Sequence, residues 1–392
     1  MAGIQDWVYA LEAGSLRGWI TRGALAVLVV GVGIYYAATQ FNGLNSAEAM
    51  DLAQIGRQLE TGQGFSTKFI RPIILKDHAE LLTAMKSSRE PMPELVHAPA
   101  YPTLLAALFT VTAPTFDLSL EDFKSGFRTY SPELYILGMN ILLLLCSAVV
   151  FYLWMTRAFD SKVATFATVL FLGSDLLWSF AISGLPMQFM VLLVCGVGFC
   201  VNEALRADET VEQESMSVVW LSVAAVLVGT LMLTRYAMLT VYLPFAVLGF
   251  TGFTRKIGCG LATALVPLII CLPWLIRNIS EVGNPFGYAW VQLFAADSNL
   301  WRMYGGNTGN YIGFNQLVRG LLDGLGNCLT SFGVLFGGLM VPALFVLGFF
   351  HMFKRERIQI ARWFWGAAFV LLLVGNAVTF KSQNIRETTD LN

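Results

Sequence analysis

Residues 45–64, NSAEAMDLAQIGRQLETGQG, decide how the rest of the chain is interpreted. The stretch follows the first hydrophobic segment directly and carries two carboxylates, Glu48 and Asp51. Asn45 can cap a helix, and Glu48 stands three residues later, at the spacing of a capping box. Gly62 is a typical stop signal at the far end. The pattern therefore predicts a helix of about four turns that opens with acidic residues.

One face of this helix is apolar. The helical period places one carboxylate on that face together with three aliphatic side chains, namely Glu48, Leu52, Ile55 and Leu59. Asp51 lies at the edge of the stripe. If the stripe packs against lipid or protein, Glu48 loses solvation and becomes a stronger base. The alternative is that Glu48 only caps the helix and that Asp51 is solvated.

Composition identifies an integral membrane protein. The 392 residues are 56% hydrophobic and only 13% charged, whereas soluble domains carry about 25% charged residues. The net charge of −1 gives no indication of nucleic-acid binding. Six cysteines and three histidines are scattered without a CxxC pair. We therefore expect neither a disulfide framework nor a metal site built from these residues.

Hydrophobic segments predict an all-α polytopic protein with about nine transmembrane helices. We expect these near residues 19–40, 134–156, 162–182, 186–204, 217–234, 237–253, 258–276, 328–350 and 361–380. The predicted layout is a cytoplasmic segment 1–18, a span 19–40, a first loop 41–133, spans within 134–276, a second loop 277–327, spans within 328–380 and a tail 381–392. Within the first loop, residues 97–113, HAPAYPTLLAALFTVTA, are too short to cross a bilayer, so we expect an interfacial, juxtamembrane helix there.

Basic residues determine the predicted orientation. Cytoplasmic loops of membrane proteins carry an excess of Lys and Arg. With a cytoplasmic N-terminus, the alternate turns on that side contain Arg157, Lys162, Arg206, Arg255, Lys256, Lys354, Arg355, Arg357 and Arg362. This layout places both long loops, and with them Glu48 and Asp51, outside the cytoplasm.

Four motifs, taken in order, resemble a known family. The first is AQIGR at residues 53–57, which matches the second half of a family helix that often contains Asp-Glu-x-x-Tyr-Ala-x-x-Ala-Arg, so that Glu48 falls on its first acid. HAPAYP at residues 97–102 is similar to a His/Lys-Pro-Pro-Leu-x-x element. LTRY at 233–236 stands at the outer end of a span, and LPWLIRN at 272–278 is followed by GNP.

Together these motifs resemble the C-type membrane glycosyltransferases (GT-C), in the branch that includes protein O-mannosyltransferases and bacterial aminoarabinose transferases. The resemblance covers about residues 20–290. It implies a GT-C-like bundle in the bacterial inner (plasma) membrane with a cytoplasmic N-terminus. It also implies an enzyme that moves a sugar from a polyprenyl-phosphate donor to an acceptor hydroxyl on the extracytoplasmic face. The sugar, the acceptor and any oligomeric partner stay open.

The resemblance and the chemistry together suggest roles for individual residues. Acceptor attack on the anomeric carbon requires a carboxylate base, for which we expect Glu48 with support from Asp51. The leaving phosphate requires cationic partners. We expect donor and sugar contacts from Arg235, Arg277, His97, Arg71, Tyr236 and Trp274. The arginines at outer span ends could instead snorkel to lipid headgroups. The sequence requires no cofactor, and it leaves a divalent metal open.

Two other functions stay open. The family's second acid is Ala49 here, its aromatic is Leu52, and Ala100 interrupts its tandem proline, which favours a non-catalytic membrane scaffold subunit. A transporter or flippase for a lipid-linked saccharide would need polar groups within the spans, and Asp175 is the acidic residue deepest in one. Relatives often continue beyond the position of Arg386, so we expect either a short variant or a missing tail.

Overall fold

The structure is a computed structural model that describes residues 15–69, 92–117, 130–210, 214–289 and 353–379, together with residues 318, 322, 326 and 347–351. Several expectations lie outside these described residues. They are most of the segment 1–18, parts of the first loop 41–133 with Arg71, most of the second loop 277–327, most of the span 328–350 and the tail 381–392.

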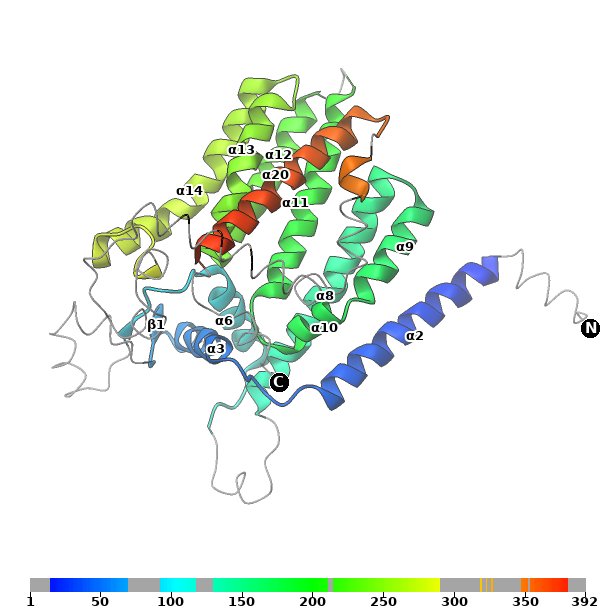
Figure 1. The fold of residues 1–392 in the computed structure, drawn as a ribbon. Coiled ribbons are helices and arrows are strands. Elements are labelled where there is room, and N and C mark those ends of the chain that lie inside the picture. Colours follow the sequence, from blue (N-terminus) through cyan, green and yellow to red (C-terminus); the bar gives the residue numbers. More distant parts are fainter. Residues whose placement is uncertain are drawn as a thin grey trace, which may run out of the picture.

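The described part is a helical bundle (Figure 1). Its helices are α2 (Ser15–Thr39), α8 (Ser131–Ala158), α9 (Ser161–Leu172), α10 (Asp175–Ile182), α11 (Met187–Asp208), α12 (Glu214–Thr234), α13 (Leu239–Thr251), α14 (Lys256–Val282) and α20 (Glu356–Thr379). Helix α11 packs between α8 and α12, α12 packs on α14, and α13 packs on α14 and α20. The largest core cluster includes Val201, Leu221, Val228 and Phe245, each at most 1% exposed. Close van der Waals packing between these helices holds the bundle together, because lipid tails are as apolar as the side chains that the helices bury.

The bundle has the character of a membrane protein. Five described helices are long and apolar enough to cross a bilayer, and a sixth span follows if α9 and α10 count as one. Side chains such as Leu142, Val149 and Ile269 are about 60% exposed on the outside of the bundle, as expected of a lipid-facing surface. The apolar parts described for the first span, Val27–Thr39, and for Tyr236–Thr251 are shorter. Of the nine predicted spans, the described residues thus account for five or six.

The predicted span 162–182 is broken. Helices α9 and α10 meet at an angle of 53° around Gly173 and Ser174. The break leaves the carbonyl of Leu172 without its helical partner, and the indole Nε1 of Trp178 donates to it at 2.7 Å. A side chain has therefore replaced a backbone hydrogen bond at the bend and satisfies this part-buried carbonyl.

The basic turns gather at one end of the bundle, which we call the basic end. Arg357 of α20 pairs with Glu209 after α11 at 3.2 Å. Arg355, just before α20, donates to the carbonyl of Ala158 at the end of α8, at 3.3 Å. These contacts join three turns that the sequence places on one side of the membrane. The grouping agrees with the predicted layout, whichever way the bundle faces.

The opposite end carries α3 (Ala47–Glu60), α6 (Ala100–Thr112) and a small antiparallel pair of strands, β1 (Ser66–Thr67) and β2 (Met92–Pro93). We call it the α3 end (Figure 1). Helix α3 lies across α6, where Gly56 allows close approach, because a Cβ there would stand 2.8 Å from Leu105 Cβ. Leu52, Tyr101 and Leu105 form the core of this contact, each at most 3% exposed.

The ends of α3 correct one prediction and confirm another. The cap is Ser46 rather than Asn45: Ser46 has extended backbone, and its side chain accepts a hydrogen bond from the backbone N–H of Ala49 at 3.2 Å. The helix ends at Glu60, and Gly62 follows with a φ of +75°. Glycine adopts that left-handed conformation without the steric cost that other residues meet, so the predicted stop signal is confirmed.

Candidate active site

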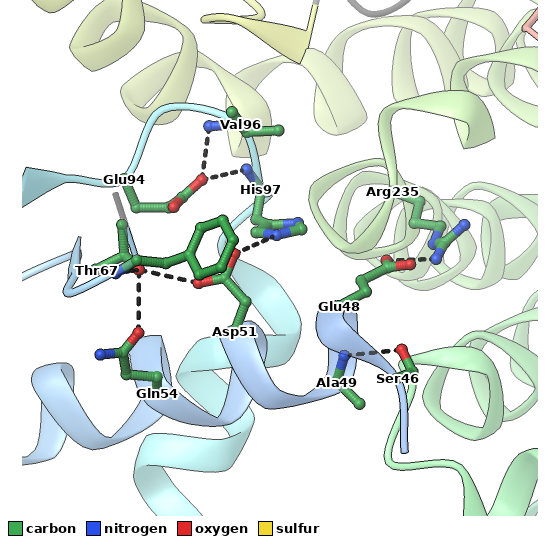
Figure 2. A network of polar contacts seen from close by, with 11 residues as sticks. Ser46, Glu48, Ala49, Asp51, Gln54, Thr67, Glu94, Val96, His97 and Arg235 are labelled. Atoms are coloured by element: carbon green, nitrogen blue, oxygen red, sulfur yellow. Dashed lines mark hydrogen bonds and ion pairs between the residues drawn. The ribbon is translucent and has the colours of Figure 1, made fainter. Parts of the chain in front are cut away.

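The two carboxylates of α3 contact different partners (Figure 2). Glu48, in the first turn, faces Arg235, and its side chain is 39% exposed. Asp51, almost one turn further on, faces His97 and Thr67, and its side chain is 8% exposed. The sequence pattern favoured Glu48 as the desolvated acid, but in the structure the buried carboxylate is that of Asp51. The reason is that the segments 65–69 and 92–97 fold over Asp51 and leave Glu48 at the rim.

Glu48 forms an ion pair with Arg235. The distance from Arg235 Nη2 to Glu48 Oε1 is 2.5 Å. Arg235 occupies the extended residue between α12 and the 3₁₀ helix η2 (Tyr236–Met238), so the end of a long helix presents it. Its side chain is 33% exposed. Because both partners reach solvent, the pair contributes little to stability, about 0–1 kcal/mol. A pair of this kind can open when a ligand competes for one partner.

Asp51 is held in a polar network. Thr67 Oγ1 donates to Asp51 Oδ1 at 2.9 Å and lies 3.2 Å from Gln54 Oε1. One hydroxyl has a single proton, so the shorter contact, to the charged carboxylate, is the stronger one. Thr67 is fully buried and belongs to β1, which positions its hydroxyl over α3. On the other side, His97 Nε2 lies 3.1 Å from Asp51 Oδ2.

His97 owes its position to Glu94. The buried carboxylate of Glu94 accepts the backbone N–H groups of Val96 at 2.7 Å and His97 at 2.8 Å (Figure 2). These bonds fix the turn that carries the imidazole. Because a carboxylate only accepts hydrogen bonds, Nε2 of His97 donates to Asp51. With its side chain 18% exposed, His97 forms an oriented, partly accessible pair with Asp51.

Arg277 clamps the α3 end onto α14. Its Nη1 donates to the carbonyl of Glu94 at 3.0 Å, and its Nη2 donates to the carbonyl of Phe65 at 3.3 Å. The guanidinium lies 4.6 Å from the ring centroid of Trp274, a cation–π geometry. The planar fork of arginine thus bridges two loop segments that lie far apart in the sequence.

Tyr236 and Trp274 join this second group. Trp274 Nε1 donates to the Tyr236 hydroxyl at 2.7 Å, and Asn278 Nδ2 lies 3.4 Å from the same oxygen. Asn278 also donates to the carbonyl of Pro285 at 3.0 Å. These bonds lock the end of α14 to the turn that follows it, so that the aromatic side chains are firmly placed.

Of the residues proposed from the sequence, the structure brings Glu48, Asp51, His97 and Arg235 together at one end of α3. Arg277, Tyr236 and Trp274 form a neighbouring group that is connected to the first through Glu94. Arg71 lies outside the described residues.

Four residues that hold this network in place were not singled out from the sequence, namely Thr67, Gln54, Glu94 and Phe65. Two of them had a local signal. Gln54 stands three residues after Asp51 on the same helix, and Glu94 stands three residues before His97. Thr67 and Phe65 had none, because only the fold brings their segment onto α3.

Within the described residues, no group of three or more His, Cys, Asp or Glu side chains could hold a metal ion. Comparison of the chain with protein-family models, with curated proteins and with solved structures found no match. What the fold and the site define is therefore a class: an all-α integral membrane protein with a carboxylate, histidine and arginine network at one end of its bundle.

Proposed function

We propose that this protein is a membrane glycosyltransferase of the GT-C type, which moves a sugar from a polyprenyl-phosphate donor to an acceptor hydroxyl at the α3 end. One observation carries the proposal. A carboxylate and a guanidinium, Glu48 and Arg235, stand in contact at a solvent-reachable position, each on a different element. Transfer requires a base for the acceptor and a cation for the leaving phosphate, and this pair supplies one of each.

The ion pair suggests how the reaction begins. The donor phosphate competes with Glu48 for Arg235, since both are anions that suit a guanidinium. Once released, Glu48 accepts the proton of the acceptor hydroxyl while the acceptor oxygen attacks the anomeric carbon. The bond between that carbon and the phosphate oxygen breaks, and polyprenyl phosphate leaves with its charge beside Arg235.

The remaining residues act by positioning. The buried bonds of Asp51 to Thr67 and His97 fix the second turn of α3 and therefore the direction of Glu48. Arg277 holds the segments of Phe65 and Glu94 in place through its backbone contacts. Such support matters because a small misplacement of a catalytic group costs a large factor in rate.

We place the site on the extracytoplasmic face of a bacterial inner membrane, with the N-terminus in the cytoplasm. The support is the segregation of the basic turns to the other end of the bundle. A lipid-linked donor would reach the site from the bilayer.

The proposal is tested with the full chain in liposomes that contain a polyprenyl-phosphate sugar and a membrane extract as acceptor source. Release of polyprenyl phosphate measures transfer. We expect Glu48→Gln to lower turnover by about 10²–10⁴-fold. Glu60→Gln, at the far end of the same helix, is the matched control and should keep parental activity. If the parent releases nothing from donors carrying mannose, glucose or aminoarabinose, the scaffold reading replaces this one.

A further inference from the structure

A cavity of about 550 Å³ lies on the other side of the N-terminus of α3. Its walls are the last turns of α2, the linker 40–46 and helix α10 with the turn that follows. Helices α2 and α10 contact one another here (Figure 1). The volume falls within the range of about 300–1,000 Å³ that is usual for small-molecule sites.

The lining mixes polar groups with apolar side chains, namely those of Phe41, Ile182 and Leu185, and is almost uncharged. Hydroxyl and amide groups predominate, from Tyr35, Gln40, Asn42, Asn45, Ser179 and Ser183. Asp175 contributes the charge, and no Lys, Arg or His is among the described residues that line the cavity. A phosphate or carboxylate ligand would find no cation here and would be repelled by Asp175. The lining therefore suits a neutral ligand with many hydrogen-bonding groups.

The carboxylate of Asp175 sits on a rigid support. The hydroxyl of Tyr36 donates to its Oδ1, and Oδ2 has no hydrogen-bond partner among the described residues. The Tyr36 ring stacks on Trp178, with centroids 5.6 Å apart and planes 16° apart. Trp178 is anchored in turn by its bond to the carbonyl of Leu172. Hence Asp175 is preorganised to accept a hydrogen bond from a ligand.

We propose that this cavity binds a neutral saccharide group. Sugar hydroxyls both donate and accept, which matches a mixture of carboxylate, amide and hydroxyl partners. Tyr35, 56% exposed, adds an aromatic ring beside them, and such a ring has an apolar face for the C–H side of a sugar. An ammonium ligand would compete for the same carboxylate, so the test includes ethanolamine as a comparison compound. Binding here does not depend on transfer by Glu48.

The test measures binding of free sugars to the full-length protein in nanodiscs. The probes are D-mannose, D-glucose, D-galactose and N-acetylglucosamine, with ethanolamine and inorganic phosphate for comparison. Saturation-transfer NMR reports the contact. We expect at least one sugar to bind saturably and neither comparison compound to do so.

Two cavity variants and one control variant locate the site. Asp175→Asn keeps an acceptor for Tyr36 but removes the charge, and it should weaken sugar binding about tenfold or more. Asp117→Asn removes an exposed charge outside the cavity and should leave binding unchanged. Asn45→Ala, on the exposed linker, removes a lining amide and should also weaken it.

Several results would overturn the proposal. The first is that the parent protein binds no sugar of the panel. The second is that ethanolamine binds and the sugars do not. The third is that Asp175→Asn and Asp117→Asn change sugar binding equally. None of these bears on transfer, since the cavity variants leave Glu48 and Arg235 intact. Conversely, loss of activity in Glu48→Gln with intact sugar binding would separate the two sites.

Discussion

His97 Nε2 lies 3.1 Å from Asp51 Oδ2, although the two residues stand 46 positions apart in the chain. The contact joins α3 to the segment that enters α6, and Thr67 closes the group from a third segment. A buried polar group of this kind is stable only when all of its members are satisfied. We therefore expect its members to act as a unit.

A double-mutant cycle tests this unit. In a protein that transfers sugar, His97→Ala and Asp51→Ala should each lower activity, and the double variant should be little worse than either single variant. The physical reason is that each change already breaks the shared hydrogen bond. Turnover with the lipid-linked donor is the measurement. Additive losses would show that the two residues act independently.

Topology gives the second prediction. A single cysteine at exposed Lys68, in a background without the native cysteines, should react with an impermeant thiol reagent in intact cells. Lys256→Cys, exposed at the basic end, should react only after lysis. The expectation follows from the excess of basic residues on the cytoplasmic side. The reverse pattern would place the candidate site in the cytoplasm and remove the case for an extracytoplasmic reaction.

Substitution of Arg277 should lower stability, whereas substitution of Arg235 should weaken donor binding. Arg277→Ala removes one donor from each of the carbonyls of Glu94 and Phe65, so we expect a loss of about 1–3 kcal/mol in unfolding free energy and a lower melting temperature in detergent. Arg235→Ala should keep the parental melting temperature and weaken donor binding instead. Arg277→Lys should not restore stability, because a single ammonium lacks the planar fork.

If Arg277→Ala melts like the parent yet loses donor affinity, then Arg277 binds the phosphate directly. Its backbone contacts would in that case be secondary. A thermal scan and a donor-binding isotherm on the same preparation decide between the two roles.

Gly56 gives a prediction about packing. Gly56→Ala places a Cβ 2.8 Å from Leu105 Cβ, so α3 and α6 must separate, at a cost of about 1–3 kcal/mol. Gly138→Ala in α8 is the control, since nothing stands within 4 Å of its Cβ position, and it should be neutral or slightly stabilising. Thermal unfolding in detergent measures both. Equal melting temperatures would mean that the contact between α3 and α6 adjusts freely.

The sequence predicted those features of the fold that depend on composition or on residues close together in the chain. Composition gave the membrane class, helical periodicity gave α3, and Gly62 marked its end. The grouping of basic turns at one end also agrees with what the loops predict. These features depend on a few neighbouring residues and on their solvation.

Burial was harder to predict. Glu48 shares a stripe with Leu52 and Ile55, yet Asp51 is the buried acid, because segments from two distant parts of the chain cover it. Similarly, Asn45 and Ser46 are both good capping residues, and the difference rests on which one adopts the extended backbone. At the break between α9 and α10, Trp178 donates to the carbonyl of Leu172 from six residues away, a contact that no local pattern indicates.

Glu94 has a consequence for how the α3 end can move. Its carbonyl receives Arg277 from α14, while its carboxylate fixes the backbone of His97. Glu94 therefore couples the tip of α14 to the imidazole, and the bonds of Arg277 to Phe65 and of Tyr288 to Leu95 strengthen that coupling. We expect a tilt of α14 to pull on the segment 92–97 and so to shift the imidazole relative to Asp51. Opening a path for a lipid along α14 and loosening the histidine would then be one motion.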